Sequence, residues 1–106
     1  MIKELQEVNF QSEVLDSARP AVVKFWSEGC YPCKMMAPIV EQFAEKYADK
    51  IMVGSVNVAN NMELAMKYKI SGVPTTILFS GGQPAAQIVG YVDLEDLEEE
   101  FADYLG

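Results

Sequence analysis

The sequence predicts a three-layer α/β domain, in which helices cover both faces of a mixed β-sheet. Segments with the apolar spacing of strands alternate with segments that have the spacing of helices, in the order β-α-β-α-β-α-β-β-α. Residues 21–26 are apolar at every position except Lys24, which is typical of a strand buried on both faces. Connections between parallel strands of such a sheet are expected to be right-handed.

The first third of the chain is expected to contain an edge strand, a short helix and the central strand. Residues 2–8 fit a short edge strand. Asn9 is a suitable N-cap for a helix that ends near Asp16 and turns Phe10 and Val14 inward.

A long helix is expected from Pro32 to about Ala48. Its apolar residues recur at three- and four-residue spacing, as in a helix with one buried face. These residues are Met35, Met36, Ile39, Val40, Phe43 and Tyr47. Pro38 lies inside this helix, and its ring removes one hydrogen bond, so we expect a kink near Lys34. The six methionines of the chain are expected to fill gaps in the core.

A strand over residues 51–58 and a helix capped by Asn60 or Asn61 are expected next. The helix ends near Tyr68 and turns its apolar side chains inward.

Two strands, over residues 75–79 and 87–92, are joined by Ser80-Gly81-Gly82-Gln83-Pro84, a turn-rich link of hairpin length. Asp93 caps a final helix with one apolar stripe. The stripe consists of Leu94, Leu97, Phe101 and Leu105.

Size and charge exclude several classes of protein. A chain of 106 residues has the size of one domain, so residues 1–106 are expected to form a single domain. Sixteen acidic and eight basic residues give a formal net charge of −8, which argues against nucleic acid or an anionic membrane as a partner. There is no histidine, so the chain contains no Cys–His or Ser–His pair and no imidazole metal ligand.

The N-terminal residues alternate in charge and lack the apolar segment of a signal peptide. No apolar run approaches the length of a membrane span. We therefore expect a cytoplasmic protein, in a compartment where thiols are mostly reduced. A C-x-x-C pair in that compartment indicates metal binding or redox catalysis.

The two cysteines, Cys30 and Cys33, lie where a strand ends and the long helix begins. Unpaired N–H groups and the helix dipole favour an anion there, so we expect the pKa of the Cys30 thiol to be lowered. Cys33 lies one turn inside the helix, shielded and close enough to form a disulfide. Pro32 costs no hydrogen bond in the first turn. The pair can attack a foreign disulfide with Cys30 and release it with Cys33.

Two other interpretations of this motif are open. C-x-x-C is half of many zinc sites, but structural zinc takes four Cys or His ligands, so such a site would need a second chain. Alternatively, both thiols are inert core residues. A helix start between Gly29 and Pro32 is a poor place to bury them.

The segment around the cysteines resembles the active site of the thioredoxin family. Residues 25–34, Phe-Trp-Ser-Glu-Gly-Cys-Tyr-Pro-Cys-Lys, are similar to the family's usual Phe-Trp-Ala-x-Trp-Cys-Gly-Pro-Cys-Lys. The resemblance covers the whole chain. Its further matches are Met35-Met36-Ala37-Pro38, Val56-Asn57-Val58, Ser71-Gly72-Val73-Pro74-Thr75, Gly81-Gly82 and Val89-Gly90. The resemblance implies a thioredoxin fold, with about five strands and four helices, and thiol–disulfide exchange.

The resemblance also implies roles for residues near the cysteines. Pro74 matches the family's cis-proline, and Val73 before it would offer its backbone to substrate as an added strand does. Gly90 matches the glycine of the substrate groove. Tyr91 would extend the substrate surface or be an ordinary exposed aromatic. Trp26 matches a residue that packs against the active-site loop, and we expect it to be structural.

The residues next to the cysteines depart from the family pattern. Gly29 replaces the usual Trp, which removes a large apolar side chain. Tyr31 replaces the usual Gly, and its ring supplies some of the apolar surface that the Trp would have provided. With Pro32, these residues are expected to contact substrate. The resulting Cys-Tyr-Pro-Cys is similar to the glutaredoxin motif Cys-Pro-Tyr-Cys with its middle residues transposed.

Lys24 is a further departure. The matching family residue is usually a buried Asp that helps to transfer the proton of the resolving cysteine, and its usual Lys partner is replaced by Ser55. A buried ammonium without a carboxylate is costly, so its pKa should fall or it should find an anion. The Cys33 thiolate and the Glu28 carboxylate are candidates. Lys24 then takes the proton of Cys33 as a neutral amine or stabilises the Cys33 thiolate as an ammonium. Alternatively, it reaches solvent and has no chemical role.

These observations predict a monomeric protein-disulfide reductase with no bound cofactor and no metal. The resemblance implies that a thioredoxin reductase supplies electrons, which pass through the Cys30–Cys33 dithiol to disulfide-containing proteins. Two alternatives stay open: a glutaredoxin-like, glutathione-linked oxidoreductase, and a non-catalytic binding module with the thioredoxin fold.

Overall fold

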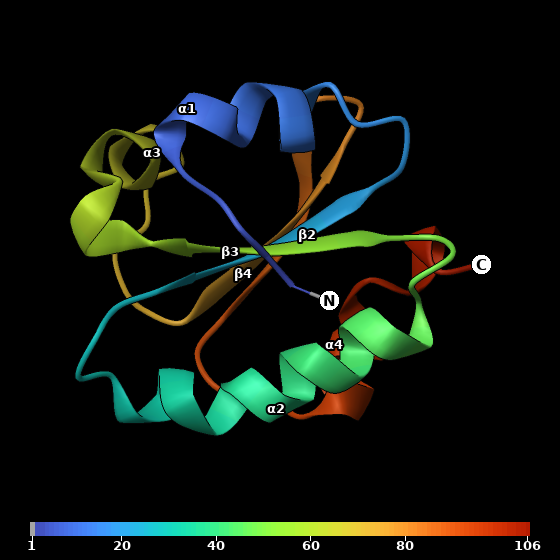
Figure 1. Cartoon of the computed structure of the whole chain (residues 1–106). Coiled ribbons are helices and arrows are strands. Elements are labelled where there is room, and N and C mark those ends of the chain that lie inside the picture. The colour runs from blue at the N-terminus through green and yellow to red at the C-terminus, as the bar shows by residue number, and fades with distance from the viewer. Residues whose placement is uncertain (1) are drawn as a thin grey trace.

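A five-stranded mixed sheet forms the centre of the computed structural model, which describes residues 2–106 (Figure 1). The strands are β1 (Lys3–Glu4), β2 (Ala21–Trp26), β3 (Met52–Asn57), β4 (Thr75–Ser80) and β5 (Gln83–Val89). Their order across the sheet is β1-β3-β2-β4-β5. Strand β3 is parallel to β1 and β2, whereas β4 is antiparallel to β2 and β5. The predicted fold class is confirmed.

Helices cover both faces of this sheet, as Figure 1 shows. One face carries α1 (Glu7–Phe10), which continues as a π-helical turn over Gln11–Leu15, and α3 (Met62–Lys67). The other face carries α2 (Tyr31–Lys46) and α4 (Leu94–Glu100). Short 3-10 segments follow β3 and α4, at Val58–Asn60 and Ala102–Tyr104. None of the helices in this part of the chain has the length and apolar character needed to cross a bilayer.

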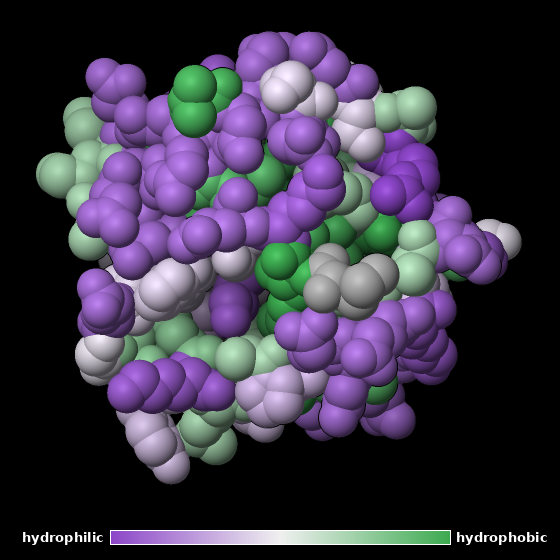
Figure 2. Space-filling view, in the orientation of Figure 1, coloured by the Kyte–Doolittle hydropathy of each residue, from purple (hydrophilic) through white to green (hydrophobic). Residues whose placement is uncertain are grey.

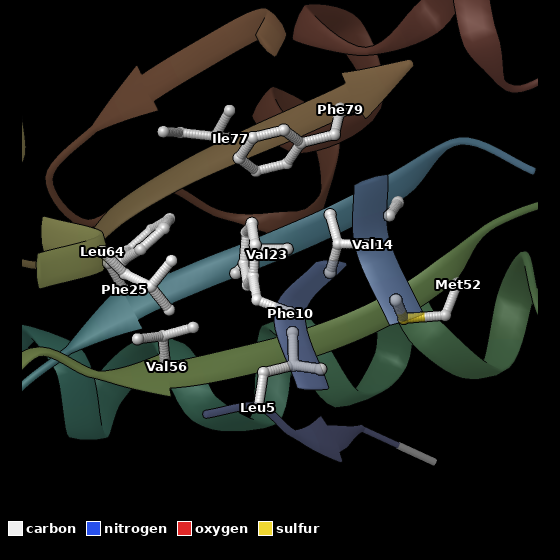
Figure 3. Packing of buried hydrophobic residues seen from close by; sticks show 11 residues of the cluster. Leu5, Phe10, Val14, Val23, Phe25, Met52, Val56, Leu64, Ile77 and Phe79 are labelled. Atoms are coloured by element: carbon white, nitrogen blue, oxygen red, sulfur yellow. The ribbon is translucent and has the colours of Figure 1, made fainter. Parts of the chain in front are cut away.

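Two apolar clusters, one on each face, hold the layers together. The alternation of side chains along β2 sends Val23 and Phe25 into the cluster under α1 and α3, which Figure 3 shows. Val22 joins the cluster under α2 and α4. Lys24 lies on this second face, where it is paired with Ser55 of β3 and Thr76 of β4. The polar residues therefore lie at the end of the second cluster, where β2 leads into α2.

The predicted strands at the centre of the sheet are confirmed, and the last strand is placed wrongly. The prediction began it at residue 87, but β5 begins at Gln83, which pairs with Ser80. Gly81 and Gly82 have φ values of 63° and 81° and form a two-residue turn. Such a turn lets pairing resume at once, so the strand starts directly after it.

The predicted cap of the first helix is also wrong. The N-cap is Gln6, and the Asn9 side chain instead accepts a hydrogen bond from the Gln6 N–H, at 2.8 Å. The other two predicted caps are confirmed. Asn61 is the N-cap of α3, and the Asp93 side chain accepts a hydrogen bond from the Asp96 N–H in α4.

The long helix is confirmed, with Pro38 inside it, whereas the predicted kink stays a prediction. The prediction that methionines fill the core is correct for Met36 and Met52, which are buried, and wrong for three others. Met35, Met62 and Met66 are 43%, 65% and 75% exposed. Met35 and Met36 are neighbours on α2, so they point in different directions and only one reaches the core. Met1 lies outside the described residues.

Candidate functional site

The loop from β2 to α2 presents the two cysteines. Strand β2 ends at Trp26, and Gly29 turns the chain with a φ of 77°, a left-handed value that suits glycine. Helix α2 then begins at Tyr31, one residue before the predicted start, and Cys30 is its N-cap residue, at the helix N-terminus where it was expected. Pro32 occupies the first turn, where its missing N–H would have no helical partner.

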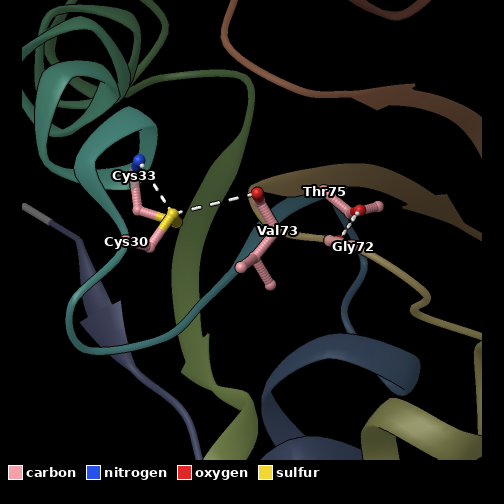
Figure 4. Close-up of a disulfide and its surroundings, with 5 residues drawn as sticks. All are labelled: Cys30, Cys33, Gly72, Val73 and Thr75. Atoms are coloured by element: carbon pink, nitrogen blue, oxygen red, sulfur yellow. Dashed lines mark hydrogen bonds between the residues drawn. A yellow bond between two sulfur atoms is a disulfide. The ribbon is translucent and has the colours of Figure 1, made fainter.

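Cys30 and Cys33 form a disulfide, with their Cα atoms 5.2 Å apart (Figure 4). The Cys30 sulfur accepts a hydrogen bond from the Cys33 N–H, at 3.2 Å. Cys30 is half-buried, whereas Cys33 is only 3% exposed. In the dithiol form, the helix N–H directed at Cys30 favours a negative charge on this sulfur. The two cysteines are therefore unequal: Cys30 can be reached from outside, and Cys33 cannot.

The loop before β4 lies against this disulfide. The Val73–Pro74 peptide bond is cis, as the resemblance implied. The Val73 carbonyl oxygen lies 3.8 Å from the Cys30 sulfur (Figure 4). The Pro74 carbonyl accepts a hydrogen bond from the Gly90 N–H, at 2.8 Å, and Thr75 Oγ1 donates one to the Gly72 carbonyl, at 2.6 Å. Within residues 2–106, the N–H and C=O of Val73 make no backbone hydrogen bond.

Exposed groups surround Cys30 on this side. Tyr31 is 71% exposed and Tyr91 is 45% exposed, and Gly29 and Pro32 are exposed too. Gly90 has a φ of 92° and is half-buried beside Pro74.

An apolar groove of about 410 Å³ begins at Val73 and extends along α3. Its main lining residues are Val58, Met62, Met66, Ile70 and Val73. This groove is not predicted from the sequence, because methionines are expected in the core.

A second cavity, of about 530 Å³, lies on the opposite side of the disulfide, between β2, β3 and α2. Its lining residues include Lys24, Trp26, Glu28, Cys33, Lys34, Glu41 and Ser55. We call it the lysine cavity. Lys24 is 7% exposed and Glu41 is exposed. Figure 2 shows that the surface is hollowed between β3 and the start of α2, with hydrophilic atoms inside the hollow.

The environment of Lys24 perturbs its ionisation. Burial lowers the pKa of the Lys24 amine below its usual 10.5, and the negative charge of Glu41 opposes this effect in part. Glu41 is thus an acidic neighbour of Lys24 that was not predicted from the sequence. The Cys33 thiolate stays a predicted counter-ion, because Cys33 is bonded to Cys30 in this structure. The available signal was the spacing of Cys33, Ala37 and Glu41 on α2, because side chains four residues apart lie on one side of a helix.

Thr76 adds a second buried polar group beside Lys24. It is 0% exposed and is directly paired with Lys24 across β2 and β4. Its hydroxyl oxygen has no hydrogen-bond partner within the described residues. The β2–β4 pair thus carries two polar side chains where the rest of this face is apolar.

Fold and site together define a class of protein. A disulfide at the start of a helix, with an accessible first sulfur, a buried second sulfur and a cis-proline beside them, is the arrangement of a thiol–disulfide oxidoreductase.

Comparison with known proteins identifies the family. A family model described as Thioredoxin matches residues 1–103. A thioredoxin of Alicyclobacillus acidocaldarius is 45% identical over 101 residues, which cover 95% of both chains. Thioredoxin 1 of Nostoc sp. is 38% identical over 102 residues, which cover 96% of this chain and 95% of the relative. The chain belongs to the thioredoxin family.

One similar protein combines two functions in its name. The bifunctional thioredoxin reductase/thioredoxin of Mycobacterium leprae is 40% identical over 87 residues, which are 82% of this chain and 19% of that protein. The matches to the thioredoxins, by contrast, extend over nearly the full length of both chains. The protein is therefore a thioredoxin-type protein-disulfide reductase whose redox group is the Cys30–Cys33 disulfide.

Proposed function

We propose that Cys30 is the nucleophile and Cys33 the resolving thiol when this protein reduces disulfides in other proteins. The observation that carries this assignment is the difference in accessibility: Cys30 is half-buried at the helix N-terminus, and Cys33 is 3% exposed behind it. A protein disulfide can approach Cys30, whereas Cys33 can only attack the Cys30 sulfur, once that sulfur is bonded to the substrate.

The reaction then has two exchange steps. The Cys30 thiolate attacks one substrate sulfur, the substrate S–S bond breaks, and the other substrate sulfur leaves as a thiolate. The Cys33 thiolate next attacks the Cys30 sulfur, which forms the Cys30–Cys33 disulfide and releases the first substrate sulfur. Two electrons pass from the dithiol to the substrate, and the protein is left oxidised.

The substrate chain is proposed to bind along Val73. The N–H and C=O of this residue make no backbone hydrogen bond within residues 2–106, and the C=O lies beside Cys30. An extended segment can add there as a strand adds to a sheet edge. Pro74 and Gly90 shape the adjoining surface, and Gly29, Tyr31, Pro32 and Tyr91 contribute exposed contact area. Trp26, which is half-buried at the end of β2, is proposed to be structural.

Electrons for the return to the dithiol are proposed to come from a thioredoxin reductase. The Mycobacterium leprae relative supports this partner, because its name joins a thioredoxin reductase and a thioredoxin in one chain. We further propose that the protein works as a monomer in the cytoplasm, where such an electron supply keeps thiols reduced.

Single cysteine variants test this assignment. Cys33→Ser should stop turnover and accumulate a mixed disulfide at Cys30, detected by mass spectrometry after exposure to a disulfide-bonded protein. Cys30→Ser should stop turnover and accumulate none, because the remaining thiol is buried.

Several results would contradict the proposal. A mixed disulfide at Cys33 in the Cys30→Ser protein would reverse the roles. Turnover driven by glutathione and not by a thioredoxin reductase would favour a glutaredoxin-like protein. Full biological activity of Cys30→Ser would favour a non-catalytic binding module.

A further inference from the structure

The apolar groove that begins at Val73 has two methionines along its rim. Met62 and Met66 are the first and fifth residues of α3, so their side chains lie on the same side of this helix, and both line the groove. They are 65% and 75% exposed. Val58, Ile70 and Val73, which also line the groove, are half-buried. None of the described residues that line it is charged, so two exposed thioethers form the outer part of an uncharged surface.

These two sulfurs stay open to oxidation when the cysteines do not. A peroxide reacts with a cysteine as the thiolate, and Cys30 and Cys33 are bonded to each other in this structure. A thioether has no proton to lose, so its exposure decides whether it is oxidised. Met62 and Met66 are the two most exposed methionines within residues 2–106. They are therefore the first targets of a peroxide in the disulfide form of the protein.

We propose that Met62 and Met66 form a paired modification site, at which a peroxide converts the thioethers to sulfoxides and so weakens the binding of substrates with apolar side chains. This inference rests on the substrate path along Val73 that is proposed above. It adds a class of substrate, namely chains with an apolar residue next to the target disulfide, and a chemical change that acts on this class.

The oxidation balances without a further reactant. The O–O bond of the peroxide breaks, and one of its oxygens forms an S–O bond with the methionine sulfur. The sulfur loses two electrons, and the rest of the peroxide is reduced to water, or to an alcohol when the peroxide is organic. No group leaves the protein. Methionine sulfoxide reductases reverse the change, so the modification is not terminal.

The change in polarity falls on the surface that a substrate side chain would meet. A methionine side chain is apolar and adapts its shape to a partner, whereas its sulfoxide is polar. An apolar substrate side chain would displace water from the sulfoxide oxygens without giving them a hydrogen bond, which costs free energy. Neither Cys30 nor Cys33 lines the groove, so the exchange chemistry itself should keep its rate.

The other described methionines provide internal controls. Met36 and Met52 are buried and should resist peroxide. Met35 is exposed and should be oxidised too, but it does not line the groove. It lies on α2, which covers the opposite face of the sheet from α3 (Figure 1). Met35 therefore separates the effect of the groove from that of surface oxidation in general.

The experiment compares two peptide disulfides, one with leucine and one with serine next to each cysteine. The disulfide form of the protein is treated with hydrogen peroxide, and peptide mapping by mass spectrometry locates the added oxygen. Catalase then removes the peroxide, and a phosphine, itself removed by gel filtration, reduces the disulfide.

The second-order rate constant of the reduced protein with each peptide is measured by chromatography of the peptide thiols. Sulfoxides at Met62 and Met66 should lower the rate constant for the leucine peptide about fivefold, which is the scale of one good interface contact. The rate constant for the serine peptide should not change.

Substitutions assign the effect to the pair, and each protein is compared with itself before and after peroxide. Met62→Leu combined with Met66→Leu keeps apolar side chains without a thioether, so peroxide should no longer change its rate with the leucine peptide. Met35→Leu should respond to peroxide as the wild type does. Met62→Gln combined with Met66→Gln places polar groups in the groove and should lower the rate with the leucine peptide without any peroxide.

Each outcome supports or contradicts the proposal. An unchanged rate with the leucine peptide after both sulfoxides have formed would overturn it, and so would resistance of Met62 and Met66 to peroxide. Equal losses for the two peptides, or a loss that persists in the double leucine variant, would place the effect outside the groove and also overturn it. Failure of the untreated wild type to reduce either peptide would instead contradict the function proposed above.

Discussion

The two sides of the Cys30–Cys33 disulfide have different chemistry. On the side of Val73 and Gly90 the surface is open, and it offers an apolar groove and the backbone groups of Val73, which make no backbone hydrogen bond within residues 2–106. On the side of Lys24 and Glu41 the surface folds into a cavity lined by charged groups. We call these the open side and the closed side. The comparison indicates that the apolar surface near Val73 and the charged cavity near Lys24 are two different environments beside the same disulfide.

Because the two sides differ, substitutions on each side should have different measurable effects. Changes on the open side should alter the choice and affinity of protein substrates. Changes on the closed side should alter the free energy of unfolding and its pH dependence. A single substitution that altered both substrate affinity and stability would contradict this separation.

The largest effect is expected for the stability of Lys24→Met. Replacement of a poorly solvated cation by an apolar side chain of similar size should raise the free energy of unfolding at pH 7 by about 2 kcal/mol. Urea unfolding, followed by far-UV circular dichroism, measures this difference. A lower stability of the variant would show that the ammonium is well stabilised on the closed side.

The pH dependence of this difference has a defined sign. Burial lowers the pKa of Lys24 below 10.5 in the folded state, so the unfolded chain binds more protons between the folded value and 10.5. The stability of the wild type should therefore rise with pH across this window, relative to that of Lys24→Met. The difference in urea midpoint between the two proteins should narrow as the pH approaches 10.5. A constant difference would contradict the lowered pKa.

An effect of about tenfold is expected from the aromatic residues of the open side. Removal of both exposed rings, in Tyr31→Ser combined with Tyr91→Ser, should lower kcat/KM for protein disulfides by about this factor, which corresponds to roughly 1.4 kcal/mol. Reduction of 5,5′-dithiobis(2-nitrobenzoate) should change little, because a small disulfide makes few contacts.

The matched control for the aromatic pair is Val8→Ser on α1, where the side chain is 91% exposed away from the site. It should leave both substrates unaffected. An equal loss with the small disulfide would show that the rings act on the cysteines themselves.

The smallest effects, of opposite sign, are expected from two adjacent threonines. Thr75 donates a hydrogen bond to Gly72 on the open side, so Thr75→Val should lower the free energy of unfolding by about 1 kcal/mol. The hydroxyl of Thr76 is buried without a partner among the described residues, so Thr76→Val should raise it by about 1 kcal/mol. Thermal unfolding of the two variants measures both, and a loss in Thr76→Val would reveal an undetected partner.

The cysteines and Pro74 on the open side and Lys24 on the closed side were predictable from the sequence, whereas the apolar groove and Glu41 were not. A strand followed by Gly29 and a C-x-x-C pair determines where the cysteines lie, because capping and dipole effects act within one turn of a helix. Pro74 and Gly90 were found by resemblance to family motifs. Lys24 stood out because it interrupts an apolar strand.

Glu41 was missed because it is one of many acidic residues on a solvent-facing surface. Its relation to Lys24 depends on how α2 packs over β2, and local sequence rules do not include such packing. The methionine errors have the same origin, because Met62 and Met66 lie on a short helix whose buried face holds few residues. The predicted start of β5 was too late because all five turn-forming residues, 80–84, were expected to form the link. In the structure, Gly81 and Gly82 alone form the turn.

The position of Trp26 has a practical consequence. It is the single tryptophan of the chain, it is half-buried, and it lines the lysine cavity together with Cys33. Its indole emission can be excited selectively and is sensitive to nearby sulfur and to the charge of its surroundings. The unlabelled protein therefore carries an optical reporter at the closed side, and fluorescence can follow both oxidation of the dithiol and the charge state of the cavity in real time.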